Sequence, residues 1–562
     1  MTSRADNPLV VQSDRSLLLE VHHPRHAEVR NQVTRFAELV SSPEHLHTYM
    51  VSPLSLWNAA SSGLTAEDVM SVLVRNSRYP VPGSLEREVR DLMGRYGRIK
   101  LVRVKDELRL VSDDPRILDD LDRVRDLQPL IADRRPDGFV LMPRQRGNVK
   151  QILLRLGLPV EDLAGYRQGA PLSVKLSTTT RGGKAWSPRE YQLQAIEAFW
   201  ADGAERGGSG VICLPCGAGK TVVGIGVMSR FQTQTLIVVP NLLAVRQWIE
   251  EILERTDLTP DQVGEYSGEA KQVCPVTVTT YQVLTQRTQD HLALFEGRDW
   301  GLIIYDEVHL LPAPIFRVTA DLQATRRLGL TATLVREDGH QEDVFTLIGP
   351  KRFDVPWKDL ESRGYIAEAI CHELRVPMGD DLRRQYWLAD KRSRYRLAAT
   401  NPVKLALCQQ LVTEHARERI LVIGQYLEQL EDVARLLGAP LLTGKTPQGR
   451  RESLYRGFRS GEIPVLVVSK VANFAVDLPD ASVAIQLSGT FGSRQEEAQR
   501  LGRLLRPKSD GRGALFYALV SQDSVDEEFA RHRQRFLAEQ GYRYTIGHRS
   551  PGERTTSPAR VS

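Results

Sequence analysis

The chain reads GVICLPCGAGKT from residue 210 to residue 221. The apolar start predicts a buried strand, and the glycines that follow predict a turn that opens a helix. Backbone N–H groups in such a turn can surround phosphate oxygens. Lys220 would then reach the β and γ phosphates of ATP, and the Thr221 hydroxyl would bind Mg²⁺. The general pattern has glycine where this chain has Leu214, so alone the match is imperfect. The stretch predicts an ATP-binding loop formed by Gly217, Ala218, Gly219, Lys220 and Thr221.

Two carboxylates follow a second apolar strand, in the sequence LIIYDEVH at residues 302–309. The end of a strand can hold Asp306 toward Mg²⁺ and Glu307 toward an attacking water. Phosphoryl transfer needs a metal holder, a group that positions water, and positive charge on the γ phosphate. We therefore predict that Asp306 and Glu307 complete the ATP site.

A basic segment near the C-terminus supplies a third part of such a site, in the sequence QRLGRLLR at residues 499–506. Arg503 and Arg506 are three residues apart, so on a helix they share one face. From a second lobe they could reach ATP bound to the first lobe, and Gln499 would sense the γ phosphate. The predicted catalytic residues are Lys220, Asp306, Glu307, Gln499, Arg503 and Arg506.

Apolar strands alternate with turns and helices over most of the chain. The first series is GVICLP, TLIVVP, TVTTY, LIIYDE and RLGLTA, and the second is RILVIGQ, PVLVVSK, SVAIQLS and ALFYALV. Continuous apolar runs of this kind are typical of buried strands in parallel sheets. We predict an α/β fold with two tandem RecA-like parallel-sheet lobes, and the split ATP site would lie between them.

The remaining boundaries follow from changes in pattern. We predict a mainly helical domain at 1–97, a small α+β domain at 98–166 that opens with a hairpin, and a linker at 167–187. The first lobe would follow at 188–365, an insertion at 366–400, the second lobe at 401–546 and a disordered tail at 547–562.

Bulk composition excludes several classes of protein. The 75 basic and 70 acidic residues leave a net charge of +5, which is too small to indicate nucleic-acid binding. Cys213 and Cys216 form a C-x-x-C without a second pair, so we expect no zinc site and no iron–sulfur cluster. The N-terminus lacks the apolar run of a signal peptide, and no stretch approaches the ~20 apolar residues of a membrane span. We expect an intracellular protein, cytoplasmic and associated with the nucleoid if prokaryotic, without a membrane partner.

These motifs, in this order, resemble superfamily 2 helicases, and in particular the xeroderma pigmentosum group B (XPB) family, here as a prokaryotic member. The resemblance is carried by DEVHLLPAPIFR (306–317), LGLTATLVRED (328–338), SKVANFAVDLP (469–479), GSRQEEAQRLGRLLR (492–506) and LVSQDSVDEEFARHRQRFLAEQGY (519–542). Loops of that family also read L-P-C-G-A-G-K, so Leu214 is no departure within it. The region that would correspond to the family's damage-recognition domain, about 98–165, matches only loosely.

The resemblance implies further roles. Arg189 and Gln192 match the adenine-recognition element, and Asp477 matches a second-lobe segment near the ribose. Coupling of hydrolysis to lobe movement is implied for His309, Thr331 and Thr333. Strand separation is implied for the charged element Arg336, Glu337 and Asp338. The family also implies 3′-to-5′ polarity on DNA, with ATP and Mg²⁺ as cofactors.

Residues 375–396 occupy the place of the family's thumb insertion, and here the local charge is informative. Basic side chains can neutralise phosphates and aromatic rings can stack on bases. The predicted DNA contacts are Arg383, Arg384, Tyr386, Trp387, Arg392 and Arg394, with Lys391, Tyr395 and Arg396 in the same stretch. A solvated amphipathic helix is the alternative interpretation.

Three functions fit these observations. The first is a DNA helicase that separates strands, and the second is a duplex DNA translocase without processive unwinding. The third is a non-catalytic DNA-binding scaffold that keeps the fold. Duplex, forked or single-stranded DNA is the expected partner, and an RNA-directed motor fits superfamily 2 in general. Relatives act in transcription initiation and excision repair, and some work with a nuclease, but the sequence names no partner protein and no pathway.

Overall fold

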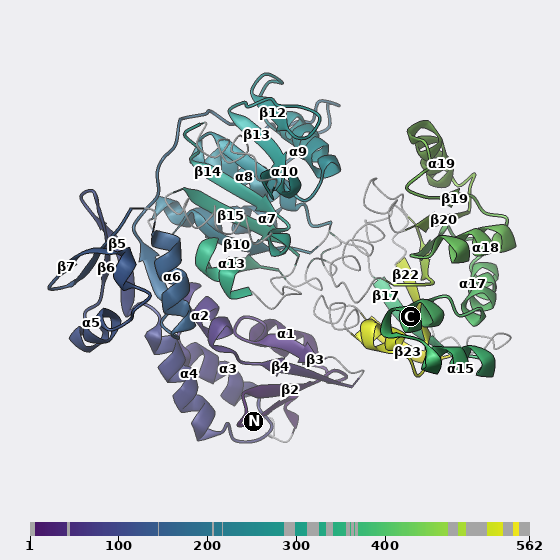
Figure 1. The fold of residues 1–562 in the computed structure, drawn as a ribbon, viewed down its shortest axis with the longest axis horizontal. Helices are drawn as coiled ribbons and strands as arrows, with labels where there is room; N and C mark the ends of the chain where they lie inside the picture. Colours follow the sequence, from purple (N-terminus) through teal and green to yellow (C-terminus); the bar gives the residue numbers. More distant parts are fainter. Residues whose placement is uncertain are drawn as a thin grey trace. The chain divides into compact units, whose positions relative to one another are not determined.

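The computed structural model describes residues 6–41, 45–143, 145–204, 207–215, 217–285, 298–311, 325–332, 341–355, 369–469, 481–489, 514–531 and 543–549, and the single residues 360, 363 and 365. The chain forms two compact units (Figure 1). Unit 1 comprises Met1–Val40, Leu46–Pro215 and Gly219–Val355, and unit 2 comprises Pro356–Ser562 with the short segments Ser41–His45 and Cys216–Ala218. No helix within the described ranges is both long and apolar enough to cross a membrane.

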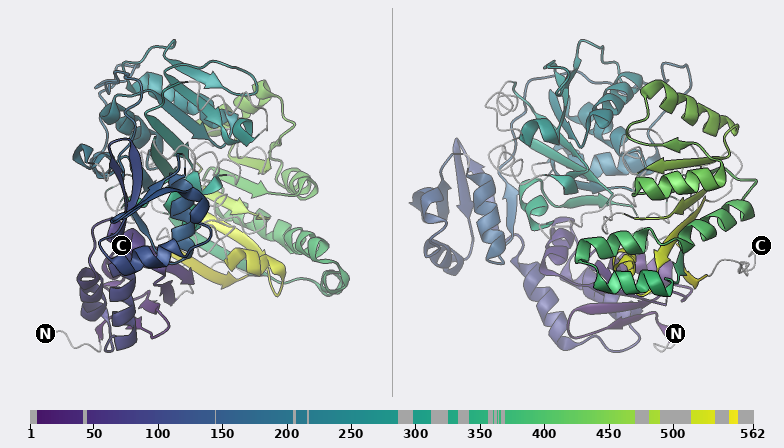
Figure 2. Two further views of the ribbon diagram at one scale, coloured as in Figure 1. Left: turned by 60° about the vertical axis from the view of Figure 1, so that its left-hand side comes forward. Right: turned by 45° about the vertical axis from the view of Figure 1, so that its right-hand side comes forward.

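The N-terminal region of unit 1 combines a small sheet with helices. Its elements are β1 (Leu9–Val11), β2 (Ser16–Glu20), α1 (His26–Val33), β3 (Glu38–Ser41), β4 (Leu46–Met50), α2 (Pro53–Ser61), α3 (Ala66–Asn76) and α4 (Gly83–Arg95). The sheet order is β1-β2-β4-β3, and β2 is antiparallel to both β1 and β4. Figure 2 shows this region in purple, with its helices grouped beside the sheet. The prediction of a mainly helical domain missed the sheet, because strands of three to five residues give no long alternating pattern.

A second small domain follows, and here the predicted hairpin is confirmed. Its elements are β5 (Ile99–Val104), β6 (Glu107–Val111), α5 (Pro115–Asp122), a 3-10 turn (Gln128–Leu130), β7 (Ile131–Arg135), β8 (Gly138–Leu141), α6 (Arg146–Arg155) and β9 (Val160–Leu163). The sheet order is β7-β8-β6-β5-β9, with β5 and β6 antiparallel. The core includes Ile117 and Leu121 of α5, with Val149 and Leu153 of α6, packed on Ile99, Leu101, Leu110 and Phe139 of the sheet. The predicted helix in GNVKQILLRLGLPV is α6.

The stretch predicted as a linker, 167–187, lies on the surface of the following lobe. Isolated bridges pair Pro171 with Thr233 and Leu176 with Thr256. The Thr233 hydroxyl also donates to the carbonyls of Gln168 and Ala170, at 2.8 and 3.1 Å. This stretch therefore packs as part of unit 1 and is not a free tether.

The first lobe is a seven-stranded parallel sheet in the order β12-β13-β11-β14-β15-β10-β16. Its strands are β10 (Ser209–Cys213), β11 (Thr235–Val239), β12 (Val263–Tyr266), β13 (Val276–Thr280), β14 (Leu302–Asp306), β15 (Arg326–Thr331) and β16 (Lys351–Asp354). Its helices are α7 (Glu190–Trp200), η3 (Ala201–Gly203), α8 (Lys220–Phe231), α9 (Leu242–Arg255), α10 (Tyr281–Thr285), η4 (Val308–Leu310) and α13 (Gln341–Leu347). All five strands predicted for this lobe are present, and β12 and β16 are additional.

The second lobe repeats this design in unit 2, with strand order β19-β20-β18-β21-β22-β17-β23 and parallel pairs throughout. Its strands are β17 (Ala369–Val376), β18 (Ile420–Gly424), β19 (Leu441–Leu442), β20 (Val465–Ser469), β21 (Val483–Gln486), β22 (Ala514–Ser521) and β23 (Arg543–His548). Its helices are α15 (Asp380–Leu388), α16 (Lys391–Ala399), α17 (Val403–Glu414), α18 (Leu427–Leu437) and α19 (Gln448–Ser460). Because β17 pairs with β22 and β23, it belongs to this sheet rather than to an insertion.

The predicted disordered tail begins too early. Strand β23 extends to His548, and the next residue, Arg549, is buried. The Arg549 guanidinium pairs with Glu414 at the end of α17. Residues 547–549 are therefore part of the second lobe, and the rest of the predicted tail lies outside the described residues.

Candidate ATP site at the carboxyl edge of the first sheet

Three neighbouring strands of the first lobe bring the predicted ATP residues to one edge of the sheet. Strands β14, β15 and β10 are adjacent and parallel (Figure 1). Their register pairs Asp306 with Leu330 and Thr331 with Cys213, so the three strands end at the same level. In open α/β sheets, ligands bind outside the carboxyl ends of the strands. The phosphate loop, the Asp-Glu pair and Thr331 all lie at this edge.

The phosphate loop has the backbone that its glycines predict. Gly217 and Gly219 have φ of 81° and 78°, in the left-handed region that favours glycine. Gly219 also leaves room for α7, since a Cβ there would lie 2.5 Å from Nε2 of Gln192. Lys220 and Thr221 then form the first turn of α8, where the backbone N–H groups favour a bound anion. The loop therefore has a cradle suited to phosphate, with Gln192 held against it.

An ion pair joins the loop to the carboxylate strand. The Lys220 ammonium is 3.0 Å from Oε1 of Glu307, and the two side chains are 12% and 13% exposed. Glu307 has φ of 50°, which turns the chain sharply after β14. Its backbone N–H donates to Oδ1 of Asp306 at 3.0 Å. Lys220 and Glu307, 87 positions apart in sequence, thus meet as the two motifs predict.

His309 connects this pair to the end of β15. Its Nδ1 is 2.7 Å from the Thr331 hydroxyl and 3.6 Å from Oε2 of Glu307. Thr331 is fully buried, and its carbonyl accepts from the Leu214 N–H at 2.9 Å. His309 and Thr331 therefore connect Glu307 to Leu214 at the start of the phosphate loop.

The surroundings shift the pKa values of the two carboxylates in opposite directions. Burial, reinforced by the charge of Glu307, raises the pKa of Asp306 to about 6. Burial acts in the same direction on Glu307, but the charges of Lys220 and His309 outweigh it and hold the pKa of Glu307 below its usual range. Glu307 is thus the more readily ionised of the two carboxylates, while Asp306 is the one that a bound cation would stabilise most.

The structure adds Trp248 of α9, which sequence analysis did not identify. Its indole N–H donates to Oδ2 of Asp306 at 2.9 Å, and the Tyr281 hydroxyl donates to the Asp306 carbonyl at the same distance. Trp248 is 1% exposed and packs across α8 at Gly224, where a Cβ would lie 2.5 Å from the ring. The missing side chain at Gly224 lets the indole reach the carboxylate.

We expect Trp248→Phe to lower the maximal rate of ATP hydrolysis by about 10-fold and to raise the Mg²⁺ concentration needed for half-maximal rate. Phenylalanine keeps most of the ring but cannot donate to Asp306, and a hydrogen bond to a charged group contributes roughly 1.5 kcal/mol or more. The measurements are ATPase rates in a Mg²⁺ titration and the melting-temperature shift caused by Mg-ADP. Trp200→Phe, at the end of α7 in the same lobe, is the matched control. An unchanged Mg²⁺ dependence would contradict a role for the indole at Asp306.

Arg189 and Gln192 lie together at the start of α7. The Arg189 N–H donates to Oε1 of Gln192 at 2.8 Å, so this glutamine caps its own helix. The Arg189 guanidinium donates to the Tyr191 hydroxyl at 3.3 Å. Eight predicted site residues lie outside the described residues, namely Thr333, Arg336, Glu337, Asp338, Asp477, Gln499, Arg503 and Arg506.

The predicted DNA contacts on α15 and α16 divide into two groups. Arg383 and Arg384 are exposed, and Trp387 is 61% exposed. Tyr386 is buried against Met378 and Ala398, and its hydroxyl accepts from the Val525 N–H at 2.9 Å. The predicted contact Tyr386 therefore has no exposed ring face on which a base could stack, and Tyr395 in the same stretch is buried as well.

Arg394 also has a structural partner. Its guanidinium donates to the carbonyls of Ala389 and Trp387, each at 3.0 Å, and so closes the end of α15. Arg392 lies in α16. Of the predicted contacts, Arg383, Arg384 and Trp387 are thus the side chains shown to be open to a ligand.

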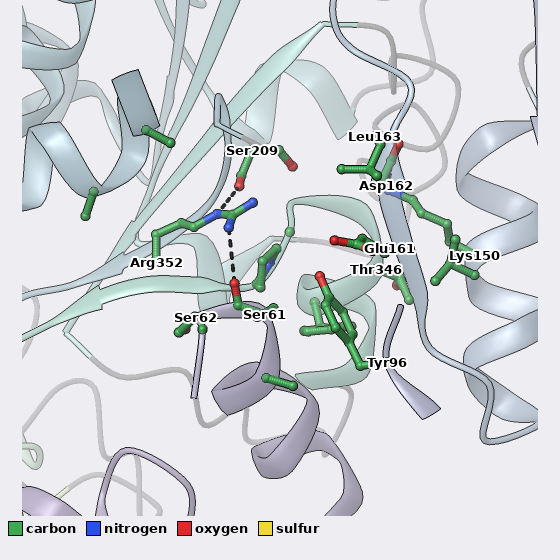
Figure 3. Close-up of a pocket in the computed structure, with 18 of the residues that line it drawn as sticks. Ser61, Ser62, Tyr96, Lys150, Glu161, Asp162, Leu163, Ser209, Thr346 and Arg352 are labelled. Atoms are coloured by element: carbon green, nitrogen blue, oxygen red, sulfur yellow. Dashed lines mark hydrogen bonds and ion pairs between the residues drawn. The ribbon is translucent and has the colours of Figure 1, made fainter. Parts of the chain in front are cut away.

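A cavity of about 470 Å³ lies elsewhere in unit 1, among the two N-terminal domains and the first lobe (Figure 3). The Arg352 guanidinium donates to the Ser209 carbonyl at 2.9 Å and lies 3.5 Å from the Ser61 carbonyl. Ser209 is the first residue of β10, whereas the phosphate loop follows its last residue. The cavity therefore marks where the N-terminal domains dock on the opposite edge of the sheet, and it is separate from the ATP residues.

Three family models match the chain. The model described as "ERCC3/RAD25/XPB C-terminal helicase" matches residues 360–558, and "Type III restriction enzyme, res subunit" matches 185–336. "Helicase conserved C-terminal domain" matches 9–135, although β2 there is antiparallel to its neighbours and unlike the strands of either lobe. Among solved structures, the Hef helicase domain of Pyrococcus furiosus aligns with 61% of this chain at 14% identity and a TM-score of 0.43.

Curated relatives match over nearly the full length. "DNA 3'-5' helicase XPB" of Kineococcus radiotolerans is 54% identical, over 96% of this chain and 96% of that protein. The protein of the same name from Mycobacterium tuberculosis is 53% identical, over 96% and 98%. The "General transcription and DNA repair factor IIH helicase/translocase subunit XPB/SSL2" of Saccharomyces cerevisiae is 31% identical, over 96% and 72%. The chain belongs to the XPB family of helicases.

Proposed function

We propose that this chain is an ATP-dependent DNA helicase or translocase that moves 3′ to 5′ and separates or remodels DNA in repair or transcription. The observation that carries the proposal is the Lys220–Glu307 pair beside Asp306, at the edge of a sheet in a chain 53% identical to a DNA 3′-5′ helicase. The site has carboxylates and a lysine of the kind that phosphoryl transfer needs, and the relatives' names indicate DNA and 3′-to-5′ polarity.

Mg-ATP is the expected nucleotide form. Mg²⁺ prefers oxygen ligands, and the Asp306 carboxylate at the end of β14 and the Thr221 hydroxyl in the first turn of α8 would offer them. The raised pKa of Asp306 fits a carboxylate placed for a cation. The bound ion would neutralise charge on the phosphates during transfer. Arg189 and Gln192 would hold the adenine, since Gln192 lies against Gly219.

The ion pair bears on how the site would respond to nucleotide. Lys220 and Glu307 neutralise each other at 3.0 Å. Phosphate oxygens would compete for Lys220, and Glu307 would then be free to accept a hydrogen bond from water. Glu307 would orient that water toward the γ phosphorus and take its proton as the water attacks. His309 would report the change in Glu307 to Thr331 and β15.

We assign the second half of the site to Gln499, Arg503, Arg506 and Asp477 on sequence grounds. Arginines that arrive only when two lobes close make hydrolysis depend on closure. Thr333 would act with Thr331 in coupling, and Arg336, Glu337 and Asp338 in strand separation. These assignments rest on the family motifs.

Trp387→Ala is expected to weaken binding of single-stranded DNA by about 5- to 150-fold, because stacking of one base on an aromatic ring contributes about 1–3 kcal/mol. Leu388→Ala is the matched control, since Leu388 is the next residue, 89% exposed and without an aromatic face. Fluorescence anisotropy with a labelled oligonucleotide measures both. Equal losses for the two variants would count against stacking by Trp387.

The proposal is tested by ATPase rates without nucleic acid and with single-stranded DNA, duplex DNA, forked DNA and RNA. Stimulation by DNA supports a DNA motor, and no hydrolysis under any condition would favour a non-catalytic scaffold. Strand displacement assayed beside triplex displacement separates a helicase from a translocase that does not unwind. Stimulation by RNA but not by DNA would show that RNA is the substrate. Co-purification would then test for a repair, transcription or nuclease partner.

A further inference from the structure

Three contacts hold the residues that follow β21, one from α17, one from α16 and one from the turn after β18. The Lys404 ammonium donates to the Leu487 carbonyl at 3.1 Å. The Gln425 N–H donates to the Ser488 hydroxyl at 2.8 Å. The Tyr395 hydroxyl donates to the Gly489 carbonyl. In the sequence, residues 487–489 come shortly before Gln499, Arg503 and Arg506.

Lys404, which bonds the Leu487 carbonyl, is itself held by a buried ion pair. The Lys404 ammonium is 2.6 Å from a carboxylate oxygen of Asp526, and the two side chains are 0% and 1% exposed. The same Asp526 oxygen accepts from the Ser521 N–H at 3.1 Å, at the end of β22. Ionic groups buried this deeply are costly to separate. The bond from Lys404 therefore fixes the Leu487 carbonyl to the second lobe.

The Tyr395 hydroxyl joins residues 487–489 to α16 instead. Tyr395 lies on α16, is 1% exposed, and packs edge-on against the Phe529 ring with centroids 4.9 Å apart. Its neighbour Arg394 donates to the Trp387 carbonyl at 3.0 Å and lies 5.7 Å from the Trp387 ring centroid. This set of contacts thus joins the exposed Trp387 to Arg394, and the next residue on α16, Tyr395, bonds the Gly489 carbonyl.

We propose that Tyr395 is a positioning residue that couples α15 and α16 to ATP hydrolysis by holding the Gly489 carbonyl. When α15 and α16 shift on binding DNA, Tyr395 moves Gly489, while Lys404 keeps Leu487 in place. Tyr395 therefore sets how strongly DNA stimulates hydrolysis, without contacting DNA or ATP. The inference rests on the proposed function, in which α15 and α16 meet DNA and residues 499–506 act on ATP.

Tyr395→Phe tests this inference because it removes only the hydroxyl. ATPase rates are measured across a DNA titration. We expect the rate without DNA to stay within about 2-fold of wild type, the DNA concentration at half-maximal stimulation to be unchanged, and maximal stimulation to fall about 3- to 10-fold, as fits the loss of one buried hydrogen bond. Ser488→Ala is the matched control, since it removes one contact at the adjacent residue but none to α16. Its ratio of stimulated to basal rate should equal that of the wild type.

Arg394→Met keeps the test decisive if Tyr395→Phe fails to fold. It breaks the set of contacts one step earlier and should lower the same ratio. A wild-type ratio in a folded Tyr395→Phe protein overturns the inference, as does a shift of the half-maximal DNA concentration alone. Absence of DNA stimulation in the wild type would instead overturn the proposed function.

Discussion

Glu307→Gln is expected to lower the DNA-stimulated kcat by about 10²- to 10⁴-fold while ATP still binds, because general-base catalysis contributes about that much. Glutamine has the same shape but cannot take a proton from water at neutral pH. Glu307 is also the ion-pair partner of Lys220 at 3.0 Å. Its replacement removes a carboxylate that competes with phosphate for Lys220, so ATP should bind at least as tightly as in the wild type. Steady-state kinetics and a fluorescent-nucleotide titration measure the two effects.

Glu269→Gln serves as the control, since it removes a carboxylate from an exposed pair with Arg246 in the same lobe. Its kcat should match the wild type. If Glu307→Gln lost ATP binding but kept kcat, Glu307 would be a binding group and the assignment as base would be wrong.

Lys220→Ala is expected to lower kcat by about 10²- to 10³-fold, the cost of removing one preorganised group that stabilises developing charge. It should also weaken ATP binding, in contrast to Glu307→Gln. The change leaves Glu307 buried beside Asp306 without its cation, so the melting temperature should fall as well. Kinetics, nucleotide titration and thermal denaturation report these three effects separately.

Lys220→Arg is the informative companion to the alanine variant. It keeps the charge but replaces a compact ammonium with a planar fork that fits a loop of backbone N–H groups poorly. We expect stability close to wild type and hydrolysis still impaired. Full hydrolysis by Lys220→Ala would refute this ATP site.

The two lobes could be predicted from sequence because their central strands are continuous apolar runs, such as those ending at Cys213 and Asp306. The edge strands could not. Strand β16 reads KRFD and β12 reads VGEY, and such short polar strands take their conformation from a neighbouring strand rather than from their own pattern. The N-terminal sheet was missed because strands of three to five residues give no long alternating pattern.

The candidate site was predictable where chemistry is local in sequence and not where packing decides. The glycine loop and the Asp-Glu pair stand out as motifs, but Trp248 reaches Asp306 only because α8 has glycine at 224. On α15, Leu382 and Tyr386 are four residues apart and pack on the same cluster. That helical spacing was the available signal that Tyr386 faces inward, with Trp387 one step round the helix.

The docking of the N-terminal domains has a consequence for how such motors diversify. Arg352 ties these domains to the first residue of β10, while the phosphate loop follows the last residue of that strand, roughly 13 Å further along. Substitutions, insertions or exchanges in the first 166 residues therefore act on the edge of the sheet that holds no reacting group. Evolution can remodel that edge to suit new tasks while selection keeps the opposite edge fixed, and chimaeric motors built at this junction should tolerate foreign N-terminal modules.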